Sequence, residues 1–168
     1  VRKVPDHRVD EMEITVFVDS DHAHDEVTRR SITGIFIFVG RTPVFYQSKR
    51  QGAIETSSYG AEFCAMRTAT EETIAVRYML RCLGVKVTHP TYMFGDNLGV
   101  VQTATMKDSL LKKNHVAIAY HKVRESPSAG IVPPMHIHTS DNYADLVTKS
   151  LNQTTFYYLV GLISYCSS

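Results

Sequence analysis

The stretch from Glu13 to Asp21 reads Glu-Ile-Thr-Val-Phe-Val-Asp-Ser-Asp, and its β-branched and aromatic residues predict a β-strand. Apolar side chains alternate onto both faces, with Val18 on one face and Phe17 and Asp19 on the other, which indicates a strand covered on both sides. A carboxylate at the end of such a strand loses solvation unless a cation or hydrogen-bond donors compensate. Asp19 and Asp21 are therefore either solvated turn residues or ligands of a metal ion, and this strand alone leaves both possibilities open.

The whole chain has the composition of an ordinary globular protein. Its 168 residues are 43% hydrophobic and 21% charged, with a formal net charge of +1 at pH 7. These values predict a single domain over residues 1–168 with a sizeable core, and they exclude a global basic field. No apolar run is long enough to cross a membrane and the start is not that of a signal peptide, so we expect an intracellular protein.

The start of the chain and its cysteines carry two further expectations. The start is polar and is not Met, so the chain is expected to be either excised from a longer polyprotein or trimmed for expression. Residues 1–11 are expected to be a linker from the preceding polyprotein region, before a core over about residues 12–151. The three cysteines lack zinc spacing. Cys64 and Cys82 fall inside a helical pattern and are expected to be buried thiols in a reducing compartment.

The order of further elements predicts the fold class. After the first strand, strands are expected at residues 31–39, 43–48, 90–95 and 131–138, and helices at 57–83, 97–105, 115–125, from 142, and at about 154–165. Tight connections predict an antiparallel meander of the first three strands, and the long helix predicts a parallel fourth strand. Pro133 and Pro134 favour an edge position for the fifth strand. We therefore expect an α/β fold with a five-stranded mixed sheet, flanked by helices on both faces.

Acidic residues lie where this topology would bring chain segments together. If the first and fourth strands are parallel neighbours, Asp19 and Asp96 emerge at the same edge, where open α/β sheets place ligands. Glu62 is expected in the first turn of the long helix, where its alternative role is a favourable partner of the helix dipole. Asp141 and Asp145 both lie near the start of the helix after the fifth strand. Asp141 is expected to cap that helix, and Asp145 to face the other acids one turn later.

Six short motifs occur in a fixed order along residues 14–151: Val18-Asp19-Ser20-Asp21, Ser48-Lys49-Arg50-Gln51, Ser57-Ser58-x-x-Ala61-Glu62-Phe63, Gly95-Asp96-Asn97, His121-x-Val123-Arg124-Glu125 and Ala144-Asp145-Leu146-x-Thr148-Lys149. In this order and spacing the chain resembles the ribonuclease H domain of copia-type (pseudovirus) LTR retrotransposon polyproteins, which follows the reverse transcriptase. The resemblance implies the ribonuclease H-like fold and hydrolysis of the RNA strand of RNA–DNA hybrids, leaving 5′-phosphate ends. It places the polymerase domain of the same polyprotein and the hybrid among the partners, and the activity in a cytoplasmic retrotransposon particle.

The resemblance also implies a metal site. It carries the catalytic and metal-binding carboxylates onto Asp19, Glu62, Asp96 and Asp145. Two Mg²⁺ ions, for which Mn²⁺ substitutes, supply both an activated water and a stabilised leaving oxygen in such sites, and Mg²⁺ prefers carboxylate oxygens. Asp19 is expected to bridge the two ions, Glu62 and Asp96 to hold the ion that activates water, and Asp145 to complete the other side.

Nucleic-acid contacts are expected on polar and basic side chains around this site. Polar side chains placed by the motifs would select the RNA strand through its 2′-hydroxyls, namely Gln51, Ser57, Ser58 and Asn97. Basic side chains would contact phosphates, namely Lys49, Arg50, Lys112, Lys113 and Arg124. The alternative for each basic residue is an ordinary solvated surface.

Other functions remain open at this stage. A non-catalytic module that binds hybrids or the polymerase would share the fold, but the retained acids argue against it. A nuclease of the integrase or resolvase type would carry fewer acids at other spacings. His22, His24, His136 and His138 suggest zinc only weakly, because no Cys accompanies them. His138 also lies only seven residues before Asp145, so the His-bearing loop that precedes the last acid in other ribonucleases H is short here.

Overall fold

The computed structural model describes residues 12–24, 27–105 and 130–164, together with positions 121, 123 and 125. The elements in chain order are β1 (Ile14–Asp21), β2 (Ile32–Val39), β3 (Thr42–Arg50), α1 (Ser58–Cys82), β4 (Tyr92–Gly95), α2 (Leu98–Thr105), β5 (Pro134–His136), the 3-10 helix η2 (Thr139–Asp141), α4 (Asp145–Thr148) and α5 (Gln153–Ile163). The helix expected at 115–125 falls almost entirely outside these residues, as does the segment expected to be a linker at 1–11.

The strands form one five-stranded sheet in the order β3-β2-β1-β4-β5. β1 pairs with β2 antiparallel and with β4 parallel, β2 pairs with β3 antiparallel, and β4 pairs with β5 parallel. The expected mixed sheet is therefore confirmed, with β1 at its centre and β5 at one edge. β5 is only three residues long, because Pro133 and Pro134 lack the N–H groups that a longer ladder requires.

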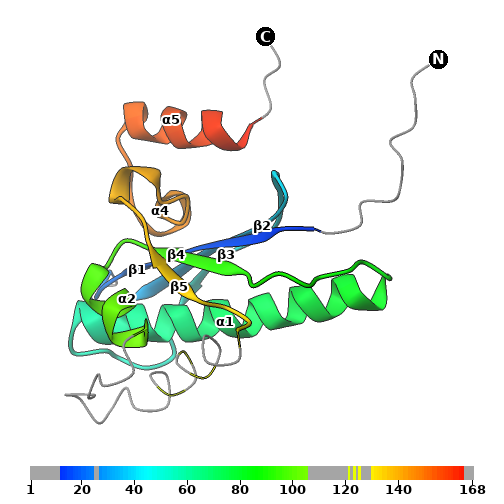
Figure 1. Ribbon diagram of the computed structural model, residues 1–168. Coiled ribbons are helices and arrows are strands. Elements are labelled where there is room, and N and C mark those ends of the chain that lie inside the picture. The colour runs from blue at the N-terminus through cyan, green and yellow to red at the C-terminus, as the bar shows by residue number, and fades with distance from the viewer. Residues whose placement is uncertain are drawn as a thin grey trace.

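Helices cover both faces of the sheet, as expected from the apolar alternation in β1. α1 runs along one face, whereas α4 and α5 lie on the opposite side (Figure 1). Val16 and Val18 pack into the core beneath α1 with Phe63 and Met66. Phe17 lies on the other face in a smaller aromatic cluster that α4 and its flanking residues close, and its ring stacks on that of Phe94 at a centroid distance of 5.4 Å.

α1 begins and ends for identifiable reasons. The Ser57 hydroxyl accepts a hydrogen bond from the Gly60 N–H at 3.2 Å, which caps the helix. Gly84 follows the helix with φ of 82°, a conformation that favours glycine. The expected buried stripe is present up to Val76, but Leu83 beyond the last turn is 75% exposed. Cys82 is also exposed, so it is not the buried thiol that the helical pattern predicted.

Two further boundaries differ from those expected. β3 continues to Arg50 because its pairing with β2 extends to Ile32, so Lys49 and Arg50 are strand residues rather than loop residues. The helix expected from residue 142 begins only at Asp145, as the four-residue α4, and the 3-10 helix η2 lies before residue 142. Asn142 separates them, because its side chain donates a hydrogen bond to the Val18 carbonyl at 3.1 Å and its backbone is extended.

Candidate active site

Three carboxylates from distant parts of the chain meet at one edge of the sheet. Ligand oxygens of Asp19, Asp96 and Asp145 all lie within 4.8 Å of one another. Asp19 is near the end of β1, Asp96 directly follows β4, and Asp145 is the first residue of α4. β1 and β4 are parallel neighbours, so their carboxyl ends emerge together. Asp19 is only 1% exposed, so its charge must be compensated within the protein or by a cation.

Asp21 takes the other role that the sequence left open. Its Oδ2 atom lies 2.5 Å from Nδ1 of His24, three residues along the chain, and its side chain is 30% exposed. Strand alternation places Asp19 and Asp21 on the same face, but Asp21 is the last residue of β1 and contacts His24 in partial contact with solvent. Of the two acids, only Asp19 belongs to the cluster.

α4 reaches the cluster because β2 has no side chain at the point of contact. Gly34 is paired with Asp19 across the β1–β2 ladder. A Cβ atom at Gly34 would overlap the methyl group of Thr148 and would lie 2.9 Å from the carbonyl oxygen of Ala144. α4 is also held by the Ser48 hydroxyl, which donates to the Val147 carbonyl at 2.7 Å. These contacts set the position of Asp145.

Two residues of α4 and its C-terminal end contact the carboxylates directly. The Thr148 hydroxyl donates a hydrogen bond to Oδ2 of Asp19. The Lys149 ammonium lies 2.8 Å from Oδ1 of Asp145, 3.3 Å from Oδ1 of Asp19 and 3.9 Å from Oδ2 of Asp96. Sequence reasoning did not assign either residue to the site. The only signal was the i, i+4 spacing of Asp145 and Lys149 within the last motif.

Glu62 lies beside this cluster, electrostatically coupled to it. Burial, reinforced by the charges of Asp19 and Asp96, raises the pKa of its carboxyl to about 9, although Lys149 partly opposes the shift. The residue is 6% exposed, and its Oε2 atom has no hydrogen-bond partner among the described residues. α1 begins at Ser58, so Glu62 lies just beyond the first turn, not within it as expected. Its alternative role as a partner of the helix dipole is correspondingly weaker.

The electrostatics of the remaining groups follow from the same crowding. Burial raises the pKa of Asp145 to about 6; the Lys149 hydrogen bond opposes this shift, and the charge of Asp19 adds to it. Burial alone would lower the pKa of Lys149, but its hydrogen bond to Asp145 and the surrounding carboxylates outweigh burial and raise the pKa. Without a bound divalent cation, the site therefore retains Lys149 as a cation and favours a protonated Glu62.

Asp141 is not part of the cluster. Its Oδ1 atom accepts hydrogen bonds from the Ser140 hydroxyl at 3.2 Å and from the Tyr158 hydroxyl at 3.4 Å. Asp141 does not cap α4 as expected: the N-cap residue is Ala144, without a side-chain capping bond. Just before the helix, the Asn142 side chain accepts from the Ala144 N–H at 3.2 Å. The hydroxyl of Thr139 donates to Oδ2 of Asp96 at 3.1 Å, so η2 also contributes to the cluster.

The chain is similar in sequence to curated retrotransposon polyproteins. No protein-family model matches the chain. The Retrovirus-related Pol polyprotein from transposon RE1 of Arabidopsis thaliana is 28% identical over 145 residues, which cover 86% of this chain and 10% of the polyprotein. The corresponding polyprotein from transposon TNT 1-94 of Nicotiana tabacum is 27% identical over 141 residues, covering 83% and 10%. The chain thus spans about a tenth of the length of these curated relatives.

Similarity to solved structures identifies the fold. The crystal structure of LC11-RNase H1 in complex with an RNA/DNA hybrid matches with a TM-score of 0.62 and 16% identity, covering 81% of this chain and 94% of that one. The protease-reverse transcriptase of prototype foamy virus matches with a TM-score of 0.53 and 12% identity, covering 98% of this chain and 22% of that one. The fold is that of ribonuclease H. The suspected relationship to the polyproteins of copia-type retrotransposons is confirmed as well.

The residues of this ribonuclease H-like chain fit a hard divalent cation. Carboxylate oxygens converge from three elements, and Mg²⁺ and Mn²⁺ prefer such oxygen donors. The buried Oε2 atom of Glu62 without a hydrogen-bond partner among the described residues is an additional donor of the same kind. The histidines add no ligand to this cluster as the structure describes it. His138, for example, contacts Ser140 through Nδ1 at 2.9 Å.

The polar residues expected to select RNA are mostly engaged within the ribonuclease H fold. Nε2 of Gln51 donates to Oγ1 of Thr33 at 3.0 Å and to the carbonyl of Ala61 at 2.9 Å, tying the end of β3 to α1. Ser57 caps α1, and Oδ1 of Asn97 accepts from the Val100 N–H at 3.2 Å at the start of α2. These hydrogen bonds position the two helix starts around the carboxylates, and contact with RNA remains a prediction.

The basic residues expected to contact phosphates divide into two groups. Lys49 and Arg50 are exposed at the end of β3, and Ser58 is exposed at the start of α1. Lys112, Lys113 and Arg124 lie outside the described residues. The contacts of both groups with nucleic acid remain predictions.

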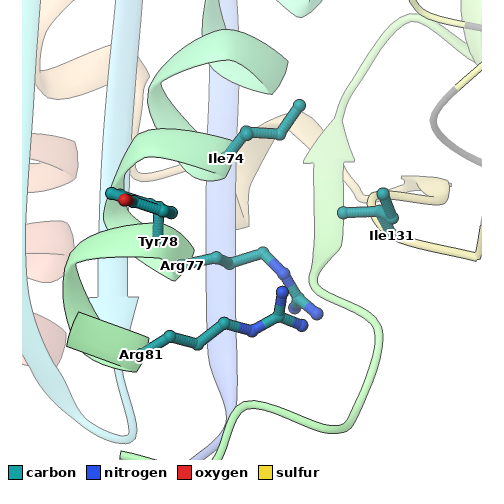
Figure 2. Close-up of a pocket in the computed structure, with 5 residues that line it drawn as sticks. All are labelled: Ile74, Arg77, Tyr78, Arg81 and Ile131. Atoms are coloured by element: carbon teal, nitrogen blue, oxygen red, sulfur yellow. The ribbon is translucent and has the colours of Figure 1, made fainter. Parts of the chain in front are cut away.

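A hollow on the same domain lies away from the carboxylates. It has a volume of about 130 Å³ and is lined by residues of the C-terminal half of α1 and by Ile131 (Figure 2). Arg77 lies at its wall, with Nη1 donating to the His89 carbonyl at 2.8 Å and to Oγ1 of Thr91 at 2.7 Å. Glu62 and Arg77 are fifteen residues apart on one helix, a separation of roughly 22 Å. The hollow is therefore distinct from the candidate active site.

Proposed function

We propose that this chain is an endoribonuclease that hydrolyses the RNA strand of RNA–DNA hybrids as the ribonuclease H part of a retrotransposon reverse transcriptase. The observation that carries the proposal is the meeting of Asp19, Asp96 and Asp145 at the carboxyl ends of β1 and β4, with Glu62 buried beside them. The ribonuclease H fold and the relationship to Pol polyproteins support the same activity. The proposed products carry 5′-phosphate ends.

The proposed cofactor is a pair of Mg²⁺ ions, for which Mn²⁺ substitutes. Asp19, Glu62, Asp96 and Asp145 would hold them through carboxylate oxygens, with Asp19 shared between the two. Bound there, such ions supply an activated water and neutralise the charge on the leaving oxygen. The protein keeps its ligands oriented: Thr148 donates to Asp19, and Thr139 donates to Asp96. These hydrogen bonds reduce the freedom of the carboxylates before any ion binds.

The proposed substrate is a hybrid duplex held through its backbone. Lys49 and Arg50 extend from the end of β3 beside the start of α1, where they would contact phosphates without reading sequence. One structural neighbour is described in complex with an RNA/DNA hybrid. A second neighbour, of which this chain covers 22%, is a protease-reverse transcriptase. We therefore propose the polymerase domain of the same polyprotein as the partner, working inside an intracellular retrotransposon particle.

The test is cleavage of a hybrid with labelled RNA in the presence of Mg²⁺ or Mn²⁺, with double-stranded RNA and double-stranded DNA as controls. Cleavage confined to the hybrid and abolished by EDTA is expected. Asp19→Asn is expected to remain folded and to lose at least about 100-fold in rate, because this carboxylate would be a ligand of the proposed metal ions. Well-folded protein that binds hybrid but never cleaves it would indicate a non-catalytic hybrid-binding or polymerase-binding module.

A further inference from the structure

We propose that Lys149 is the resident counter-ion of the carboxylate cluster, a positioning residue whose ammonium occupies the cation position until divalent ions displace it. This inference rests on the proposed function, because it concerns how the same carboxylates receive metal. It gives a role to Lys149, the last residue of the Ala144–Lys149 motif. From the sequence, that motif had served only to identify Asp145.

The ammonium lies where a shared cation would lie. Its distances to carboxylate oxygens are 2.8 Å for Asp145, 3.3 Å for Asp19 and 3.9 Å for Asp96, so it contacts three acids from three different elements. An ion bound to Oδ1 of Asp145 at about 2.1 Å would lie within roughly 5 Å of the present position of Nζ. Cations at that separation in a buried site repel strongly. Lys149 must therefore move when the same oxygen binds a divalent ion.

Lys149 can move while the carboxylates stay. Its side chain is 33% exposed, whereas those of Asp19 and Asp145 are 1% and 6% exposed. It is the C-cap of α4, with an extended backbone, and its flexible four-carbon stem can carry the ammonium into water. Thr148 holds the other oxygen of Asp19, so the orientation of that ligand does not depend on Lys149.

The metal-free protein needs such a cation. Three carboxylates within 4.8 Å of one another repel when no positive charge lies between them. α4 is only four residues long, and Lys149 links it to β1 and to the end of β4 through the ion pairs with Asp19 and Asp96. The same ion pairs that stabilise the metal-free site oppose metal binding. Removal of the charge should therefore have opposite effects on these two properties.

The experiment compares wild type, Lys149→Met and Lys149→Arg by thermal unfolding in EDTA and by calorimetric titration with Mn²⁺. For Lys149→Met we expect a midpoint lower by about 3–6 °C without metal and an Mn²⁺ dissociation constant about tenfold smaller. Lys149→Arg, which keeps the charge, should remain close to wild type. Lys86→Met removes an exposed lysine beyond the C-terminal end of α1 and should change neither property. If Lys149→Met does not fold, Lys149→Gln supports the same comparison.

Equal Mn²⁺ affinity in wild type and Lys149→Met, including no binding by either, overturns the inference, as does an unchanged midpoint in EDTA. A wild type that cleaves hybrid while the affinities are equal retains the proposed function and loses this inference. A wild type that binds no Mn²⁺ while Lys149→Met binds it tightly supports the inference and contradicts the proposed function.

Discussion

Among individual residues, Glu62 has the least ordinary environment. Burial and the neighbouring charges of Asp19 and Asp96 raise the pKa of its carboxyl from 4.5 to about 9, so the metal-free protein holds this group protonated at neutral pH. Divalent cations favour the ionised form of a ligand. Metal binding by this site should therefore be accompanied by release of a proton, and it should strengthen as the pH rises.

The shifted pKa of Glu62 predicts how the stability of metal-free protein depends on pH. The folded state keeps this proton up to about pH 9, whereas the unfolded chain releases it near pH 4.5, so the free energy of unfolding falls as the pH rises between these values. Asp145, with a pKa raised to about 6, adds to the fall at the lower end. In EDTA the thermal midpoint should drop between pH 6 and pH 9. Glu62→Gln should reduce that drop, and a pH-independent difference between the proteins would contradict the assignment.

Asp145 and Asp141 should differ in their effect on metal binding and cleavage. Asp145→Asn should weaken Mn²⁺ binding and slow hybrid cleavage by about 10- to 100-fold, because it removes one ligand of the cluster. Its midpoint in EDTA should be unchanged or raised, because one of three adjacent negative charges is lost. Asp141→Asn is the matched control: it is four residues away and outside the cluster, and should retain most activity. Inactive Asp141→Asn together with active Asp145→Asn would show that the fourth ligand is misassigned.

At the scale of elements, the position of α4 depends on a missing side chain in β2. Gly34→Ala would place a methyl group against Thr148 and 2.9 Å from the Ala144 carbonyl, a backbone group that cannot turn aside. We expect a loss of about 1–3 kcal/mol of stability by overpacking, with weaker Mn²⁺ binding because α4 carries Asp145. Gly161→Ala is the control, since nothing lies within 4 Å of a Cβ there, and alanine in α5 should stabilise by about 0.5–1 kcal/mol. Equal stability of the two variants would exclude close contact between α4 and β2.

At the scale of the whole molecule, the chain has no large positive field to attract nucleic acid, because its net charge is only +1. The proposed hybrid binding must therefore rest on local groups of basic residues. We expect its affinity to be modest and to depend on the release of counter-ions from phosphates. No helix among the described residues is long and apolar enough to cross a membrane.

This charge distribution predicts a steep salt dependence of hybrid binding. Hybrid binding can be titrated by fluorescence anisotropy in Ca²⁺ at salt concentrations from about 50 to 200 mM. The logarithm of the association constant should fall linearly with the logarithm of the salt concentration. Lys49→Ala should reduce the magnitude of the slope by about 0.7–0.9, the contribution of one phosphate contact. Lys86→Ala, beyond the C-terminal end of α1, should leave the slope unchanged. A flat dependence for wild type would argue against the basic residues at the end of β3.

Local sequence was sufficient for the parts of this protein that depend on short-range rules. Strand alternation distributed Phe17 and Val18 onto opposite faces, and the parallel connection through a long helix brought Asp19 and Asp96 to one edge. The motif order then indicated the family, and the similarity to retrotransposon Pol polyproteins supports it. These features follow from periodicity and from the handedness of chain connections, which do not require knowledge of side-chain contacts.

Tertiary structure alone decided which side chains complete the site. Lys149 and Thr148 contact Asp19 across 130 and 129 residues of chain, and no periodicity encodes a contact of that range. Gln51, Ser57 and Asn97 hydrogen-bond to the starts of helices, because unpaired N–H and C=O groups near helix ends need partners. Their contact with RNA remains a prediction. From the sequence, Gly34 cannot be distinguished from an ordinary strand glycine. Only the packing of α4 against it shows why a side chain does not fit there. The sequence thus determined where the acids gather, whereas packing decided which neighbours hold them and which cation balances their charge.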